Sequence, residues 1–529
     1  MSFQNLTQTP AWLDLVAHAK EMQKSTLVDL FKRDSARGTR FSLSTENIYL
    51  DYSKNHLTHD TLHKLIALAE QQALAQNITA LSNNKYSSNH LTLRDPASDA
   101  YQHTLHSLEK LLHHVEQITR TDQITDIVHL GVGGSYLGPV MVNFAGQQWH
   151  KPQDSQSAFQ LHYAYAMDGR DLSRLLVKLK PQNTLFIVAS KSFTSIDTLV
   201  NAELALSWLQ SRLNKDKTWL IARHFIGISA YPEKMHAWGI AEKHQLTMNT
   251  QTVGRYSLWS VMGLPIALYL GLDKFKQLLA GAYAMDQHFK EADFASNIPV
   301  IMGLLAVWNH SFLDYFNHIH LPYHSSLEYL PYYLQQLSME SLGKSCTRNH
   351  LSTDYITGAV TFGAVGFAAQ HSFFQLLHQG TGRFACDFIG VTKPDSSLHG
   401  SLTNQQLARQ HKLALANCFT QSRILMSGSH ADQQNGVANQ SGVQYLPGNK
   451  PSTTLLLDKL TPFTLGSLLA LYEHQTFVES VIYHIDPFSQ DGVELGKRVA
   501  EYLYNNHSLA NNLDSSSTAL LRKCGFDDG

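Results

Sequence analysis

The feature that most constrains the fold is a repeated order of apolar run, small polar loop and helix-compatible segment. It first occurs at 126-DIVHLGVGGSYLGP-139, where an apolar run ends in glycines. It recurs at 184-TLFIVASKSFTSIDT-198, and another apolar segment, 225-FIGIS-229, follows after a further helical interval. Strands that alternate with helices are typical of parallel sheets with crossover helices, so the sequence predicts an α/β fold.

Two loops of this pattern are candidate ligand sites, because ligands of parallel sheets bind where loops meet helix N-termini. The loop 131–138 is not a dinucleotide fingerprint, since GxGxxG requires glycine where Tyr136 stands. A tight turn near a small ligand and a plain structural turn both remain open. The loop 190-SKSFTS-195 offers hydroxyls, amides and Lys191, which suit a phosphate, whereas a capped helix start is the alternative. No Walker pattern GxxxxGK[ST] occurs in the sequence, which disfavours a nucleoside triphosphate.

The rest of the chain is predicted to be rich in helices. Apolar spacing predicts an amphipathic helix within 56–75, ended by the polar stretch 77–96. The second half contains three patterned helical segments, one strand candidate and one exposed loop, which are 258–290, 298–318 and 364–379, then 384–391, and 427–444.

Two charged residues stand where helix stability does not explain them. Glu340 lies near the end of an apolar-periodic segment that stops at Gly343, and a carboxylate there opposes the helix dipole. A general base is one explanation and an exposed glutamate is the other. Lys497 shares a predicted helix face with Val493 and Ala500, where an ammonium is unfavourable unless it is paired or functional.

Two further residues are ambiguous from the sequence. Arg255 is flanked by glycine and aromatic residues, which fits either cation–π packing or recognition of an anion. His371 shares an apolar face with Phe367 and Phe374, where a histidine is usually a satisfied core residue.

Composition narrows the class of protein. A formal net charge of −2 and a pI near 7.0 do not indicate the basic surface that binds nucleic acid or an anionic membrane. The N-terminus lacks a signal-peptide pattern and the longest apolar runs, such as 298–308, are too short to span a membrane, so we expect a cytoplasmic protein.

The sequence predicts no metal site and no disulfide. The cysteines are scattered without a CxxC pair, which indicates reduced thiols; they are Cys346, Cys386, Cys418 and Cys524. The 29 histidines are dispersed without HExxH, and we expect most of them on solvated helix faces.

Nine segments, taken in order, closely resemble the glucose-6-phosphate isomerase (phosphoglucose isomerase) family. The similarity runs from roughly residue 41 to 523. The segments are DYSKN (51–55), GVGGSYLGP (131–139), ASKSFTS (189–195), GRYSLWS (254–260), MDQHF (285–289), QQLSMESLGK (335–344), QHSFFQLLHQGT (370–381), TPFTLGSLLALYEH (461–474) and GVELGK (492–497).

The resemblance implies two sugar-isomerase (SIS) type domains, each a parallel sheet flanked by helices, with helical N- and C-terminal extensions. It implies helical segments in 1–100 that pack on the large domain, a smaller SIS domain in 101–290, a larger one in 291–510 and a tail in 511–529. It further implies a homodimer with the active site at the subunit interface.

The resemblance also implies a reaction, the interconversion of glucose 6-phosphate and fructose 6-phosphate in glycolysis and gluconeogenesis, without cofactor or metal. Glu340 is then the base that moves a proton through an enediolate, and Arg255 stabilises the negative charge. His371, from the neighbouring subunit, and Lys497 assist ring opening. The substrate-binding residues implied are Ser190, Lys191, Ser192 and Ser195 for the phosphate, with Ser135, Gln336 and Gln490 lining the site.

Several positions depart from the family pattern, and most of them remove polar groups. They are Ser88, His90 and Arg94 within 87–94, then Tyr136, Val253, Leu342 and the segment 362–371. We therefore expect lower efficiency or an altered sugar preference. The alternative from another class is a non-catalytic, phosphosugar-binding regulator, and a nucleotide-dependent oxidoreductase is a third reading, weakened by the failed glycine fingerprint.

Overall fold

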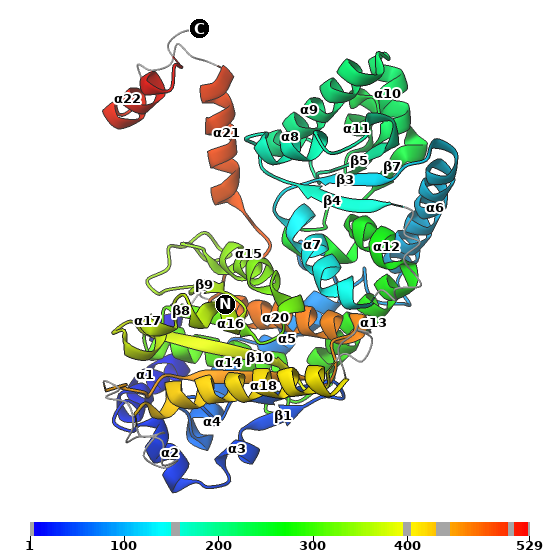
Figure 1. The fold of residues 1–529 in the computed structure, drawn as a ribbon. Coiled ribbons are helices and arrows are strands. Elements are labelled where there is room, and N and C mark those ends of the chain that lie inside the picture. The colour runs from blue at the N-terminus through cyan, green and yellow to red at the C-terminus, as the bar shows by residue number, and fades with distance from the viewer. Residues whose placement is uncertain (1–4, 150–158, 395–403, 430–444, 506–512, 527–529) are drawn as a thin grey trace.

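The protein is built around two separate β-sheets with helices on their faces (Figure 1), as a computed structural model shows. The structure describes residues 5–149, 159–394, 404–429, 445–505 and 513–526. This confirms the predicted α/β class with two sheet domains. Among the described residues, no helix combines the length and the apolar character needed to cross a membrane.

The smaller sheet has five strands, all parallel, in the order β4-β3-β5-β6-β7. The central strand β5 is buried at every residue, which explains the unbroken apolar run that the sequence shows there. The three predicted strands of this unit are confirmed. The strands are β3 Asp126–Leu130, β4 Gln160–Ala164, β5 Thr184–Ala189, β6 Phe225–Ser229 and β7 Gln245–Thr247.

The larger sheet has six strands in the order β1-β2-β11-β10-β8-β9. Strands β11, β10, β8 and β9 are parallel, whereas β2 is antiparallel both to β11 and to β1, with which it forms an N-terminal hairpin. The predicted strand at 384–391 is confirmed as β10. The strands are β1 Ser42–Ser44, β2 Ile48–Asp51, β8 Asn317–Pro322, β9 Val360–Gly363, β10 Phe384–Val391 and β11 Ser452–Leu457.

One buried helix, α20 Pro462–Ile482, forms the centre of the core. It crosses α13, Leu272–Glu291, at unusually close range. A Cβ on Gly281 would lie 1.8 Å from the Phe463 carbonyl oxygen, and one on Gly466 would lie 2.0 Å from that of Leu278. Only glycine permits this approach of the two backbones.

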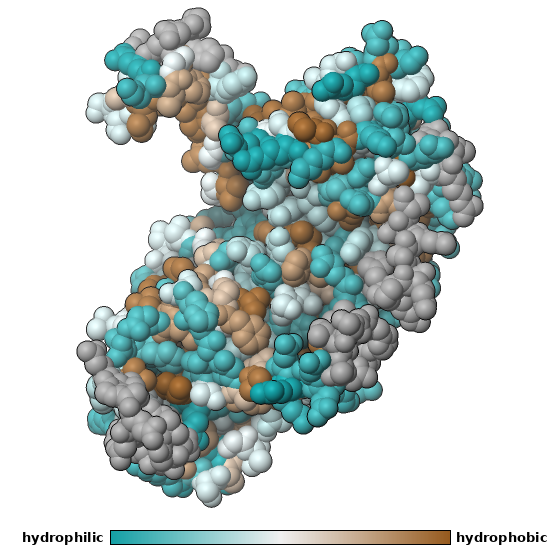
Figure 2. All heavy atoms as spheres, in the orientation of Figure 1, coloured by the Kyte–Doolittle hydropathy of each residue, from teal (hydrophilic) through white to brown (hydrophobic). Residues whose placement is uncertain are grey.

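The two ends of the chain are placed differently. Near the N-terminus, the Trp12 ring lies 4.5 Å from that of Phe312, and the amide of Leu27 donates to Asn449, which ties this end to the larger sheet. Near the C-terminus, α21 Asp491–Asn505 and α22 Ser515–Lys523 stand away from both sheets (Figure 1). Apolar side chains are visible on this projecting part of the surface (Figure 2).

The remaining helices cover the two sheets. They are α1 Pro10–Met22, α2 Leu27–Arg33, α3 Arg37–Arg40, α4 His59–Gln71, α5 Leu74–Ser82, α6 Asp99–Asp122, α7 Gly134–Gly146, α8 Arg170–Leu176, α9 Ile196–Leu213, α10 Lys217–His224, α11 Pro232–Trp238, α12 Leu264–Leu270, α14 Ile298–Val307, α15 Leu330–Leu342, α16 Gly366–Gln370, α17 Phe374–Gln379 and α18 Asn404–Ser427.

Several predicted helix bounds are wrong, and local backbone signals explain why. The segment 258–290 is split, because Gly271 at φ +87° separates α12 from α13. The segment 298–318 ends in a π-helical turn, Trp308–Phe312, before β8 begins. The segment 364–379 divides into α16 and α17, and α5 occupies part of the predicted break at 77–96. Most of the loop 427–444 lies outside the described residues.

The expectation that most histidines lie on solvated helix faces does not anticipate a sizeable buried group. Among the described residues nine are buried, and they are His56, His90, His129, His224, His244, His310, His318, His320 and His474. Several occupy strands or contact buried carboxylates, a partnership that sequence spacing does not display.

Candidate active site

The site begins where the glycine loop meets the 3₁₀ segment Gly254–Trp259. A Cβ on Gly134 would lie 2.0 Å from the Gly254 carbonyl oxygen, so the two backbones are in direct contact. Gly133 has φ +55°, and a Cβ there would lie 3.1 Å from Nε2 of Gln336. The glycines therefore allow the glycine loop to approach the 3₁₀ segment and α15 closely. This places Arg255 and Gln336 against the glycine loop.

Arg255 is buried and held rigidly. Its Nε donates to Ser341 Oγ at 2.7 Å, and Nη2 donates to the carbonyl of Ser489 at 3.1 Å and to that of Pro487. The remaining Nη1 lies 3.4 Å from Oε1 of Glu340 and 3.5 Å from Oε1 of Gln490. The guanidinium is therefore a fixed cation that faces a carboxylate. Its Cζ lies 5.7 Å from the centre of the Tyr256 ring, which is a secondary contact.

Glu340 lies in the last turn of α15, between two of the residues predicted for the site. Gln336 Nε2 donates to its Oε2 at 2.9 Å, one helical turn earlier, and Arg255 faces its Oε1. The side chain keeps 18% of its surface exposed, so it is reachable from solvent. The unfavourable helix-end position is offset by the adjacent cation. An accessible carboxylate beside a fixed cation suits proton abstraction next to a developing oxyanion.

Sequence reasoning missed Lys344. Its Nζ donates to the carbonyl oxygens of Glu340 at 2.5 Å and of Ser341 at 3.2 Å, which satisfies the C-terminal end of α15. Burial, and next the positive charge of Arg255, lowers the pKa of the Lys344 ammonium to about 8. A basic residue just after a helix end often binds the last carbonyl oxygens of the helix. Lys344 follows the predicted helix end at Gly343, so this contact could have been predicted from the sequence.

The hydroxyl loop after β5 does not cap α9 in the usual way. Ser190 Oγ donates to Ser195 Oγ at 3.1 Å, and Thr194 Oγ1 donates to Ser192 Oγ at 2.9 Å. Among the described residues no side chain caps the N-terminus of α9, although Ser195 occupies the N-cap position. The alternative of an ordinary capped helix start is therefore wrong. Hydroxyls and a helix N-terminus together provide donors suited to an anion.

Cations and a buried ring fix this loop. Phe193 adopts φ +49° with its ring buried, so the loop turns sharply between Ser192 and Thr194. Burial, and next the positive charge of Arg255, lowers the pKa of the Lys191 ammonium. Lys234 Nζ donates to the Ser192 carbonyl at 3.0 Å and is a second cation that the sequence reading missed.

Ser135 lies in the first turn of α7 and is buried. His129 Nε2 donates to its carbonyl oxygen at 2.8 Å, which fixes the turn from the neighbouring strand. Burial lowers the pKa of His129 to about 4, so this imidazole is neutral at physiological pH. Its role is to hold the glycine loop, not to carry charge.

A buried ionic network holds the 3₁₀ segment that carries Arg255. Arg94 binds both carboxylate oxygens of Asp286 at 2.6 Å and one oxygen of Glu473 at 2.5 Å. The other Glu473 oxygen accepts from Trp259 at 2.8 Å and from Tyr333 at 3.2 Å. Because Trp259 ends the 3₁₀ segment that carries Arg255, this network fixes the segment in place.

Two predicted residues, His371 and Lys497, form no hydrogen bond or ion pair with Arg255 or Glu340 in the described part of the chain. His371 follows α16 and is exposed, so the core interpretation of this histidine is wrong. Lys497 lies on α21, where every described side chain is at least partly exposed, so the expected unfavourable burial of its ammonium does not occur. Among the described residues, Lys497 Nζ is paired with Glu494 at 3.0 Å rather than with the cluster.

The departures from the family pattern mostly serve packing. Leu342 and Val253 are buried in the main core. Tyr136 is half-buried, and its ring stacks on that of Tyr165 at 4.6 Å. Arg94 is the central cation of the ionic network described above. These residues leave the contacts of Arg255 and Glu340 in place.

Comparison with known proteins identifies the relationship. A sequence model of the family described as phosphoglucose isomerase matches residues 51–521. The chain belongs to the phosphoglucose isomerase family. It is 43% identical to glucose-6-phosphate isomerase of Hydrogenovibrio crunogenus over 97% of this chain and 98% of that protein. It is 42% identical to glucose-6-phosphate isomerase of Psychrobacter cryohalolentis over 97% and 96% of the two chains.

The fold agrees with this membership. A crystal structure of a glucose-6-phosphate isomerase from Chlamydia trachomatis superimposes with a TM-score of 0.83 over 99% of both chains, at 24% identity. At that identity the likeness concerns the fold alone. It shows that the arrangement of two sheets is the one found in a solved phosphoglucose isomerase.

Proposed function

We propose that the protein catalyses the reversible isomerisation of glucose 6-phosphate and fructose 6-phosphate in the cytoplasm, as a step of glycolysis and gluconeogenesis. The observation that carries the proposal is the 3.4 Å approach of the Glu340 carboxylate to the fixed guanidinium of Arg255. Family membership over residues 51–521 supports the same reaction.

The chemistry requires one base and one stabilised oxyanion. In the open-chain aldose, the Glu340 carboxylate takes the proton from C2, and the C2–H electrons form the C1–C2 double bond of an enediolate whose charge falls on O1. Arg255 stabilises this charge without moving, because its other donors are engaged. Transfer of a proton from O2 to O1, followed by return of the carbon-bound proton to C1, gives the ketose.

The hydroxyl loop supplies the binding energy that orients the sugar. We assign the phosphate to Ser190, Lys191, Ser192 and Ser195, at the N-terminus of α9. Binding at a group remote from the reacting carbons positions C1 and C2 for proton transfer. Ser135, Gln336 and Gln490 complete the lining of the site in this proposal.

Ring opening requires groups that one chain does not bring to the cluster, and we assign them through a homodimer. His371 is exposed and is supplied by the neighbouring subunit, while Lys497 lies on the projecting helix α21. That helix leaves Leu495 58%, Val499 45% and Tyr502 52% exposed, at a spacing that places them on one face. A second copy of the chain would cover this face.

The deciding experiment follows fructose 6-phosphate with the purified protein in D₂O by proton NMR, without added metal or nucleotide. Appearance of glucose 6-phosphate with deuterium at C2 is the expected result, because an enediolate intermediate allows its proton to exchange with solvent. Binding of the sugar phosphate without any product would overturn the proposal and favour the non-catalytic regulator.

A further inference from the structure

A second cluster of reactive side chains lies within the larger sheet, outside the proposed active site. His318 and His320 are two residues apart on β8 and so point to one face, and Asp387 pairs in register with His320 on β10. All three are buried. One ligand atom from each, a ring nitrogen or a carboxylate oxygen, lies within 4.8 Å of the other two.

The contacts within this cluster are close, yet the ring nitrogens are not hydrogen-bonded. His318 Nε2 lies 3.0 Å and His320 Nδ1 lies 3.3 Å from the same oxygen, Oδ2 of Asp387. Among the described residues neither nitrogen has a hydrogen-bond partner of acceptable geometry. The two ring nitrogens therefore face one carboxylate oxygen, which also accepts a hydrogen bond from Tyr472 at 3.2 Å. Ligands 2.0–2.1 Å from a tetrahedral ion lie about 3.3 Å apart, which matches the two nitrogen–oxygen separations.

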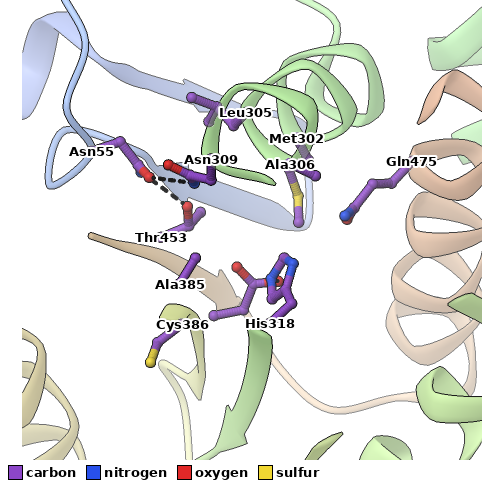
Figure 3. A pocket seen from close by; sticks show the side chains of 11 residues that line it. Asn55, Met302, Leu305, Ala306, Asn309, His318, Ala385, Cys386, Thr453 and Gln475 are labelled. Carbon is purple, nitrogen blue, oxygen red and sulfur yellow. Dashed lines mark hydrogen bonds and ion pairs between the residues drawn. The ribbon is translucent and has the colours of Figure 1, made fainter. Parts of the chain in front are cut away.

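The surroundings offer room and unsatisfied polar atoms for one more small ligand. A cavity of about 10 Å³ is lined by Asp387 and by His318, Asn309 and Gln475, of which Figure 3 labels the last three. That is close to the minimum space for one water molecule. Gln475 Oε1 and both ring nitrogens of the buried His310 also lack hydrogen-bond partners among the described residues. His318 and Gln475 approach the cavity from different elements in Figure 3.

The charges of this region also call for a cation. Asp387 and Glu479 are both buried, and the ion-pair contacts of these carboxylates within the described part of the chain are with histidines alone. Glu479 Oε2 has no hydrogen-bond partner there. Burial raises the pKa of Glu479 to about 8, so this carboxyl is largely protonated at neutral pH. Asp387 is then the buried charge that needs a counter-charge, either a protonated imidazole or a divalent ion.

We propose that His318, His320 and Asp387 bind one Zn²⁺, with a water molecule in the adjoining cavity as the fourth ligand. Two imidazoles and a carboxylate are a ligand set that suits Zn²⁺, and the ion's lack of geometric preference tolerates a site built on two strands. The space beside the site admits a water but no sugar, so the ion stabilises the larger sheet and takes no part in the isomerisation.

The first test measures the zinc content of the full-length protein by mass spectrometry after exhaustive dialysis. We expect about one Zn²⁺ per chain in the wild type, as one site predicts. His318→Gln and Asp387→Asn should lose at least nine-tenths of it. His162→Gln is the matched control, because His162 Nε2 contacts Asp126 at 2.8 Å in the other sheet without a third ligand. Zinc retained by both site variants would overturn the proposal.

The second test uses the wild-type chain and does not depend on the folding of variants. Zinc is removed with a chelator, and ZnCl₂ or CoCl₂ is then added. We expect Tm to rise by several degrees with Zn²⁺, and Co²⁺ to give the visible absorption of a four-coordinate site. No gain in Tm, together with no bound metal after addition of ZnCl₂, would overturn the proposal and leave protonated histidines as the counter-charges.

Discussion

At the scale of single residues, the two partners of the proposed catalytic pair are restrained to different degrees. Arg255 donates to a hydroxyl and two backbone carbonyls. Among the described residues, the Glu340 carboxylate accepts one hydrogen bond, from Gln336 in the same helix, and faces Arg255 at 3.4 Å. The cation is therefore fixed while the carboxylate keeps rotational freedom, which suits a base that must reach two adjacent carbons.

Replacement of the base tests this assignment. Glu340→Gln should lower kcat by about 10² to 10⁴, because the amide cannot accept the proton, while fructose 6-phosphate still binds. Steady-state kinetics and isothermal titration measure the two effects. Glu328→Gln, on an exposed side chain just before α15, is the control and should change neither. Near-normal turnover of the first variant would remove Glu340 from its role.

The hydroxyl loop should affect binding more than turnover. The double replacement of Ser192 and Ser195 with Ala removes two hydroxyl donors near the N-terminus of α9. We expect KM for both sugar phosphates to rise at least tenfold, since hydrogen bonds to charged groups contribute about 1.5–3 kcal/mol each. Ser211→Ala, near the far end of the same helix, controls for helix effects. An unchanged KM would contradict the phosphate assignment.

Lys344 makes the reaction sensitive to mild alkali. Its pKa is lowered to about 8, so it is charged at neutral pH and loses its proton as the pH rises through 8. Because its ammonium lies beside Arg255 and holds the end of α15, wild-type kcat/KM should fall above that pH. Lys344→Met should be less active at pH 7 and should lack this alkaline limb. Lys24→Met, on an exposed lysine, should reproduce the wild-type profile.

The same shift predicts how stability depends on pH. A lysine whose pKa is lower in the folded than in the unfolded chain binds fewer protons when folded, so the free energy of unfolding rises with pH between the two values. The Lys344 contribution is thus unfavourable below pH 8 and is relieved as the pH approaches the ordinary lysine value of 10.5. Urea unfolding at several pH values should show this slope in the wild type and a smaller one in Lys344→Met.

At the scale of elements, the site depends on two backbones that touch. Gly134→Ala would place a Cβ 2.0 Å from the Gly254 carbonyl and 2.7 Å from the Arg255 amide, so the segment that carries Arg255 must shift. A displacement of about 1 Å can lower a rate about 10²-fold, and we expect kcat/KM to fall by that order. Gly38→Ala has no atom within 4 Å of the added carbon and should be neutral. Equal activity of the two variants would show that the contact does not position Arg255.

Three strands of the smaller sheet, β3, β5 and β6, were predictable because each is a largely apolar run followed by a loop. The edge strands β4, Gln-Leu-His-Tyr-Ala, and β7, Gln-Leu-Thr, were not predicted, because they are short, partly polar and partly exposed. The order of β3, the glycine loop and α7, and that of β5, the hydroxyl loop and α9, follow directly from the sequence. The split of 258–290 was also visible, since Gly263, Pro265 and Gly271 interrupt it. The support given to Arg255 by Ser341 and Glu473 was not visible, because it joins segments that only the tertiary fold brings together. Likewise, the alternation His-Ile-His at 318–320 places two imidazoles on one face, but Asp387 joins them from a distant strand.

At the scale of the whole molecule, α21 carries the apolar face that we propose a second copy of the chain covers. Leu495, Val499 and Tyr502 recur on it at helical spacing and are about half exposed. Leu495→Glu with Val499→Glu should convert a dimer into a species of 59.3 kDa in light scattering and abolish activity, because His371 of one chain would no longer reach the other site. Glu501→Lys, a polar position of the same helix, should remain dimeric. A wild-type chain that is already monomeric and active would contradict the dimer.

The order of the larger sheet has a consequence for synthesis on the ribosome. The N-terminal hairpin emerges early, yet Asp51 pairs with Thr454, which is translated roughly 400 residues later. The buried helix α20 follows later still. At about 5–20 residues per second the hairpin therefore waits on the order of tens of seconds for its partner strand, with its edge available to other chains. The larger domain can close only when translation is nearly complete, so premature termination anywhere before residue 482 leaves a nascent chain without its central helix and dependent on chaperones.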